Sequence, residues 1–213
     1  RGMSSAASDV YKRQAGRTDR GVHAIQQSAH FDCKKKILKL EKFLVSLNHF
    51  LNKEDIAIKK INKKLILFHA RYSAKFRVYR YIIINRQVKS VLYKNRAWHV
   101  IRKLDLKLMR QGAKKLVGKK DFSTFRSSSC SARSPIRKII YVKIKLSNSK
   151  IAIEFKSKSF LQQQVRSMVG CLKYLGEKRW SLSKFNKILQ SKKRSLCAPP
   201  APPQGLYLKK IIY

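Results

Sequence analysis

A single aspartate lies between two arginines in residues 15–24, AGRTDRGVHA. Asp19 has Arg17 and Arg20 beside it, in a chain with only 10 Asp and Glu residues. Nearby cations favour an ionised carboxylate, so we expect Asp19 to be charged at neutral pH. Such a group can act as a nucleophile or base, or it can form an ion pair with Arg17 or cap a turn. Composition and spacing leave both roles open, and no second ligand stands at the spacing that a metal site needs.

The chain is strongly basic, with 51 Lys and Arg and a net charge of +41 over 213 residues. Such a surface repels itself unless a polyanion offsets it, so nucleic acid is the first partner to consider and an anionic membrane the second. A general drift of composition toward lysine is a further explanation, but it does not account for clustered arginines. The hydrophobic content of 44% is enough for a packed core in one large or two small domains.

The sequence has no apolar run long enough to span a bilayer and no pattern of a secretory signal. Its four cysteines form no close pair of the metal-ligand kind: Cys33, Cys130, Cys171 and Cys197. We therefore expect free thiols in a cytoplasmic protein that binds neither membrane nor metal.

Apolar periodicity predicts a mixture of helices and strands. The predicted helices cover residues 40–51, 104–118, 160–176 and 181–191. The predicted strands cover residues 25–33, a short and a longer strand within 64–85, and then 136–146, 150–157 and 205–213. They follow no regular βαβ order, so we predict the α+β class with antiparallel sheet.

Residues 1–14, RGMSSAASDVYKRQ, show neither helical nor strand periodicity. They look like a translated sequencing adapter, and we expect them to be a non-native leader.

Five blocks of the sequence, in order, resemble the TruA-type tRNA pseudouridine synthases. GRTDRGVHA (16–24) is similar to the signature that carries the family's catalytic aspartate. The other blocks are FHARYSAKFRVYRYIIIN (68–85), DFSTFRSSSCSARSPIRKI (121–139), FLQQQVRSMVG (160–170) and APPQGLYL (201–208). The family pattern has Phe where Tyr72 stands, and often His or Met within the glutamine run 162–164.

The resemblance implies isomerisation of uridine to pseudouridine in the anticodon stem and loop of tRNAs (tRNA positions 38, 39 and 40), without a cofactor or metal. It implies the pseudouridine synthase α+β fold, a homodimer of chains with two domains, mainly antiparallel sheets flanked by helices, and a basic cleft. We expect the remainder of the N-terminal catalytic domain in residues 15–66 and the C-terminal domain in 67–213. The family's opening strand, Gly-Trp-Gln segment and helix have no counterpart here, so we expect exposed apolar surface and poor stability in the N-terminal part.

The resemblance also assigns roles to four side chains. Asp19 corresponds to the catalytic aspartate, which attacks covalently or removes a sugar proton. Tyr79 would stack on the uracil, Arg166 would pair with Asp19, and Arg17 would fill the space that the flipped base leaves. The residues alone allow other roles: core packing for Tyr79, solvent exposure for Arg166 and a plain phosphate contact for Arg17.

Two segments look like the family's tRNA-contacting loops, in which short polar residues and arginine suit sugar and phosphate groups. They contain Phe68, His69, Ala70, Arg71, Tyr72, Ser129, Cys130, Ser131, Ala132 and Arg133. A non-catalytic RNA-binding protein would explain the positive charge equally well. Asp19 distinguishes the two hypotheses, because only an enzyme would depend on its carboxylate.

Overall fold

The computed structural model describes residues 13–33 and 37–213, so most of the expected leader, residues 1–12, lies outside the described residues. The chain forms two compact units. One contains the described residues of Arg1–Gln14 and Ala29–Ser73, and the other contains Ala15–Ser28 and Ala74–Tyr213. The predicted boundary between residues 66 and 67 stays a prediction, and each unit is described by itself.

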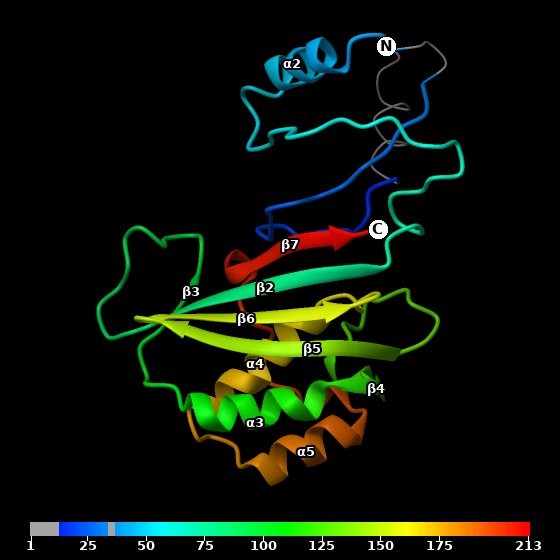
Figure 1. Cartoon of the computed structure of the whole chain (residues 1–213). Coiled ribbons are helices and arrows are strands. Elements are labelled where there is room, and N and C mark those ends of the chain that lie inside the picture. Colours follow the sequence, from blue (N-terminus) through cyan, green and yellow to red (C-terminus); the bar gives the residue numbers. More distant parts are fainter. Residues whose placement is uncertain (1–12, 34–36) are drawn as a thin grey trace. The chain divides into compact units, whose positions relative to one another are not determined.

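The second unit is built on a seven-stranded sheet with the order β1-β7-β2-β6-β5-β4, in which β3 also pairs with β2 (Figure 1). Four neighbouring pairs are antiparallel, and only β1–β7 and β2–β3 are parallel. This mainly antiparallel sheet confirms the predicted α+β class. The strands are β1 (His23–Ala24), β2 (Phe76–Asn85), β3 (Trp98–Val100), β4 (Gly118–Asp121), β5 (Ile136–Ser147), β6 (Lys150–Ser157) and β7 (Leu206–Ile212).

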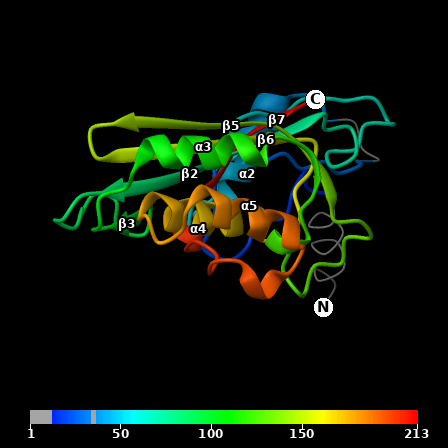
Figure 2. The ribbon, with the colours of Figure 1, turned by 90° about the horizontal axis from the view of Figure 1, so that it is seen from below.

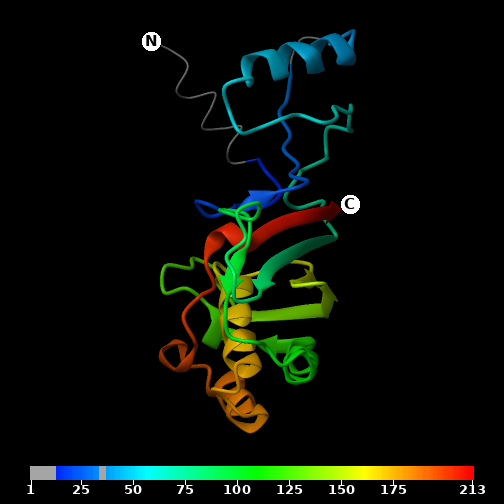
Figure 3. The same cartoon turned by 90° about the vertical axis from the view of Figure 1, so that its left-hand side faces the viewer.

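Three helices of the second unit lie side by side (Figure 2): α3 (Leu106–Leu116), α4 (Gln164–Gly176) and α5 (Leu182–Ser191). Figure 3 shows α4 descending from the strands toward α5. Side chains cap two of these helices, because Asp105 accepts from Leu108 N–H and Ser181 from Lys184 N–H. The predicted helices over 104–118 and 181–191 are thereby confirmed, with slightly shorter bounds.

The sheet and the helices enclose one hydrophobic core. Strand β6 shows why, since its alternate residues Ile151, Ile153 and Phe155 are buried, as its two-residue period requires. They meet the buried side chains of Tyr81 on β2 and Leu172 on α4 in the same cluster. The helices of the second unit thus pack on the face of the sheet that also carries Tyr79.

Helix α4 approaches the proline-rich segment before β7 very closely at Gly170. A β-carbon at this position would lie 2.1 Å from the carbonyl oxygen of Pro199. Just beyond, Ala201 N–H donates to the carbonyl oxygen of Arg166 at 3.0 Å. The absence of a side chain at Gly170 therefore allows this segment to bind along the first turns of α4.

The first unit contains helix α2 (Leu40–Phe50), which confirms the helix predicted over 40–51. None of its residues is fully buried, although Asn48 exchanges two hydrogen bonds with the backbone of Ile58, of 2.9 and 2.7 Å. Residues 65–67 (Leu-Ile-Leu) expose 85%, 93% and 91% of their surface. This matches the expected apolar surface in the N-terminal part, while its poor stability stays a prediction.

Two predicted strands do not form. In residues 25–33 only Ala29 makes a bridge, to Gln14, and Ile25 and Phe31 are exposed. The short strand predicted near the start of 64–85 is also absent. Alternating side chains make a strand only where a neighbouring strand pairs with the backbone over several residues. In residues 25–33, Ile25 and Gln26 N–H donate to the Leu208 carbonyl of β7, at 2.9 and 3.4 Å, but this pairing does not continue along the segment.

Helix α4 begins at Gln164, four residues later than predicted. Gln163 has a left-handed backbone (φ 59°), and the Gln164 side chain accepts from Leu161 N–H at 2.8 Å. The prediction began too early because the apolar period of α4 continues back to Leu161, although residues 160–163 fold as a turn before the helix. Strands β3 and β4 were not predicted, because they contain 3 and 4 residues and are too short for alternation to be read.

None of the helices in the described part of the chain is both long enough and apolar enough to cross a membrane.

We predict that Gly170→Ala lowers the free energy of unfolding by about 1–3 kcal/mol, because the new methyl group meets a backbone carbonyl that cannot move aside. Gly176→Ala is the matched control in the same helix, since its methyl group would meet only the side chains of Met109 and Leu104. Urea unfolding of both variants measures the difference. An equal loss in the two variants would contradict a tight α4 contact at Gly170.

Candidate active site

Asp19 lies in a loop that closes on itself at its base. Ala15 N–H donates to the Ser28 carbonyl at 2.8 Å, and the Gln27 amide donates to the Gly16 carbonyl at 2.7 Å. Within the loop, Val22 N–H donates to the Asp19 carbonyl at 3.0 Å, which makes a tight turn. Gly21 has φ +78° in this turn, a conformation that favours glycine. Gly21 of the motif therefore shapes the turn that presents Asp19.

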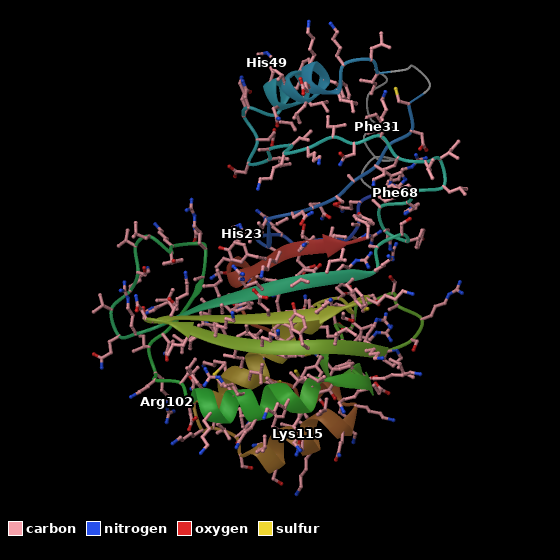
Figure 4. The ribbon with its side chains drawn as sticks, in the orientation of Figure 1. His23, Phe31, His49, Phe68, Arg102 and Lys115 are labelled. Carbon is pink, nitrogen blue, oxygen red and sulfur yellow. The ribbon has the colours of Figure 1, made fainter. Side chains whose placement is uncertain are left out.

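The far end of the loop is fixed to the sheet through β1. His23, which Figure 4 labels, pairs with Tyr207 of β7. The two rings stack with centroids 4.8 Å apart. The His23 ring nitrogen Nε2 also lies 3.0 Å from the Asn95 carbonyl oxygen. His23 thus fixes the end of the loop to β7 and to the segment before β3.

Arg166 and Asp19 come together although 147 positions separate them. Arg166 Nη1 donates to Asp19 Oδ2 at 3.3 Å. Its Nε donates to the Ala201 carbonyl at 2.7 Å, so the guanidinium is held from two sides. The side chains are 13% and 35% exposed, respectively. The ion pair is thus partly shielded, while Asp19 remains accessible to a substrate.

Tyr79 on β2 belongs to the same site. Its hydroxyl lies 3.6 Å from where a β-carbon of Gly16 would be, and its ring meets Phe160 edge to face, with centroids 5.3 Å apart. Burial raises the pKa of Tyr79 to about 12; the charge of Arg77 lowers it and that of Asp19 raises it. The phenol is therefore protonated at neutral pH, and its ring is half-buried beside the aspartate loop.

Arg17 and Arg20 are exposed on either side of Asp19. Their guanidinium groups add positive charge on the open side of the loop, where an anionic substrate would approach. Arg166 and Tyr79 thus lie on the protein side of Asp19, and the two motif arginines on the solvent side.

The segment 129–133 divides into exposed and buried residues. Ser129, Ser131 and Arg133 are exposed, whereas Cys130 is only 8% exposed and Ala132 packs against the core. The exposed three can reach a ligand with their side chains, but Cys130 holds the segment in the protein.

The segment 68–72 belongs to the first unit. Ala70 is fully buried and donates its N–H to His30 Nδ1 at 3.1 Å, while Arg71 and Tyr72 are exposed. His69 accepts from Arg71 N–H at 3.1 Å, and desolvation, with the charge of His30 second, lowers its pKa. Phe68 is half-buried, with its ring 6.2 Å from that of His30. The structure thus presents an arginine and a tyrosine at this surface.

Sequence patterns did not identify three residues around Asp19: Gln27, Arg77 and Phe160. The signal for Arg77 was available, because strand alternation places it on the apolar face that carries Tyr79. A charged residue on such a face needs buried partners. Gln27 and Phe160 lie in loops, where no period identifies a partner.

Among the described residues, no group of three or more His, Cys, Asp or Glu side chains could hold a metal ion.

Known proteins that are similar to this chain belong to one enzyme family. The family model described as tRNA pseudouridine synthase matches residues 113–213. The tRNA pseudouridine synthase A of Pelagibacter ubique is 61% identical over 199 residues, covering 93% of this chain and 81% of the relative. The enzyme of the same name from Rhodopseudomonas palustris is 43% identical over 203 residues, covering 94% and 81%.

The match extends over nearly the whole chain in some relatives. The tRNA pseudouridine synthase A of Zymomonas mobilis is 38% identical over 212 residues, covering 100% of this chain and 86% of the relative. A basic α+β protein with an arginine-paired aspartate beside a half-buried tyrosine fits a class of enzymes that act on RNA bases. The chain belongs to the tRNA pseudouridine synthase family.

We predict that Tyr79→Phe makes stability less dependent on pH in alkaline solution. The folded-state pKa of Tyr79 is raised to about 12, above the usual value of about 10. Below about pH 10 both states keep the proton, and stability then falls up to about pH 12, because the unfolded chain ionises first. Urea unfolding between about pH 9 and 12 should show a shallower decline in the variant. Identical slopes would contradict the burial of this phenol.

Proposed function

We propose that this protein isomerises uridine to pseudouridine in tRNA, with Asp19 as the catalytic residue. The observation that carries the proposal is the Arg166–Asp19 ion pair beside Tyr79, in a chain that belongs to the tRNA pseudouridine synthase family. The exposure of Asp19 and the strong positive charge of the chain support it further.

The reaction breaks the N1–C1′ bond, turns the uracil, and forms a C5–C1′ bond. The C5 proton is lost and N1 gains one, so atoms and electrons balance without a cofactor or a metal. The Asp19 carboxylate starts this sequence either as a nucleophile on the nucleotide or as a base on the sugar. In both routes the carboxylate acts through its oxygens, and the Arg166 guanidinium holds one of them, Oδ2, at 3.3 Å.

The neighbouring side chains then have distinct tasks. The uncharged phenol ring of Tyr79 offers a flat surface for the uracil. The edge-to-face contact with Phe160 supports the ring in its orientation. The target base must leave its stack, which costs a few kcal/mol. Arg17 is exposed and can fill the vacated space, because a planar guanidinium can stack and bind phosphate together.

We infer the finer features from the family resemblance. The modified uridines are those on the 3′ side of the anticodon stem and loop, and the tRNA lies in a basic cleft between two domains. The enzyme is a homodimer in the cytoplasm. The enzyme recognises mainly the shape of the folded tRNA. Arg71, Arg133 and the exposed serines of segment 129–133 contact the sugar-phosphate backbone of the tRNA.

The central test is Asp19→Asn. We expect this variant to lose about a thousandfold or more in turnover. It should bind tRNA at least as tightly as the wild type, because one negative charge is removed. Tritium release from C5-labelled, undermodified tRNA measures turnover, and filter binding measures affinity.

Asp105→Asn is the matched control, since it removes the same charge in the same unit. Asn caps a helix as well as Asp, so α3 should stay intact and turnover should be unchanged. If wild type, Asp19→Asn and Asp105→Asn turn over equally, Asp19 is not catalytic. If none of them releases tritium while all bind tRNA, the protein is an RNA-binding protein without this activity.

We predict that Arg71→Ala and Arg133→Ala each weaken tRNA binding and reduce the salt dependence of log Kd by about one ion, with little change in kcat. Arg110→Ala removes the same charge from the exposed side of α3 and serves as the control. Titrations of tRNA at several salt concentrations compare the three variants. Equal losses in all of them would mean that general positive charge, and not these two segments, contacts tRNA.

A further inference from the structure

We propose that Arg77 is a positioning residue, which fixes the loop that carries Asp19 relative to the ring of Tyr79. The inference deepens the proposed function and rests on it, since it concerns how Asp19 is placed for the reaction. Arg77 lies on β2 and is only 9% exposed.

The Arg77 guanidinium is bound to two separate backbone segments. Its Nε and Nη2 both donate to the Ala15 carbonyl, at 3.0 and 2.7 Å, and its Nη1 donates to the Lys158 carbonyl at 2.6 Å. Ala15 begins the loop that presents Asp19. Lys158 leads directly to Phe160, which supports the Tyr79 ring. One side chain thus connects the two segments that flank Tyr79.

The register of β2 explains why this connection is precise. Arg77 and Tyr79 are two residues apart and pair in regular register with Ser157 and Phe155 of β6, so they lie on the same face of the strand. The charge of Arg77 also acts on the phenol, because it lowers the pKa of Tyr79 against the larger effect of burial. The positions of Tyr79 and of Ala15, where the Asp19 loop begins, are therefore both set by strand β2.

Arginine is suited to this task in a way that lysine is not. A planar guanidinium has five N–H donors in fixed directions, and here it serves one carbonyl with two of them and a second carbonyl with a third. A lysine ammonium is a point donor on a flexible chain, so it can keep the charge without fixing both carbonyls. Arg77→Lys should therefore retain folding better than it retains geometry.

The neighbouring Arg80 provides a matched control. It lies on the same strand but on the opposite face, where its Nη2 pairs with Glu154 Oε1 at 2.7 Å. Both arginines are well anchored, yet only Arg77 contacts the segments of the site. Replacing either residue removes one positive charge and the hydrogen bonds of one guanidinium.

The test compares Arg77→Met, Arg77→Lys and Arg80→Met in the full chain. Misplacing a catalytic group by about 1 Å can cost about a hundredfold in rate. We therefore expect kcat to fall about 10- to 100-fold in Arg77→Met and less in Arg77→Lys, with KM and the Kd for tRNA within about threefold of wild type. Arg80→Met should keep kcat within about twofold of wild type, even if its melting temperature falls as much as that of Arg77→Met.

A second measurement does not depend on activity. Amide hydrogen exchange of residues 15–28 should accelerate in Arg77→Met and not in Arg80→Met, because only Arg77 holds the Ala15 carbonyl. If Arg77→Met does not fold, the same comparison is made with Arg77→Lys. Unchanged exchange in this loop, or wild-type kcat in a folded Arg77→Lys, overturns the inference. A wild type that does not act on tRNA would instead refute the proposed function, while accelerated exchange would still support the anchor.

Discussion

The ion pair between Arg166 and Asp19 is the constraint around which the second unit is arranged. A half-exposed carboxylate among arginines would otherwise be free to turn toward Arg17 or Arg20. Arg166 holds it from helix α4, and Ala201 fixes the guanidinium in turn. That contact requires the proline-rich segment to bind along α4, which the missing side chain at Gly170 allows. Helix packing thus determines where the acid is placed.

Different arginines of the site attract the anionic substrate and hold the Asp19 carboxylate. The solvent side of Asp19 carries exposed arginines, which attract a polyanion over a long range. The protein side carries Arg166, whose guanidinium is partly shielded from solvent and keeps more of its strength there. Tyr79 adds no charge, because a phenol is protonated at neutral pH and burial raises the pKa of Tyr79 further, to about 12. A negatively charged RNA can therefore approach a negatively charged carboxylate without displacing it.

Local patterns predicted the helices and the longer strands of the sheet, and the resemblance predicted that distant residues would meet. The Ser181 cap and the apolar period of α5 are complete within one segment, as are the two strands of the β5–β6 hairpin, and these predictions were confirmed. Residues 25–33 alternate like a strand but do not pair continuously with a neighbouring strand, which no local pattern can report. Periodicity alone allowed a solvated Arg166. The roles assigned to Asp19, Tyr79 and Arg166 stay predictions, although the three side chains lie together.

The most direct test of the account is the single-turnover rate of Arg166→Met, measured with enzyme in excess over tRNA, alone and combined with Asp19→Asn. If Arg166 works by holding Asp19, its loss should lower the rate about a hundredfold with tRNA affinity unchanged. It should then have no further effect once Asp19 is replaced. An unchanged rate in Arg166→Met, or a further loss from it in the Asp19→Asn background, would contradict the account.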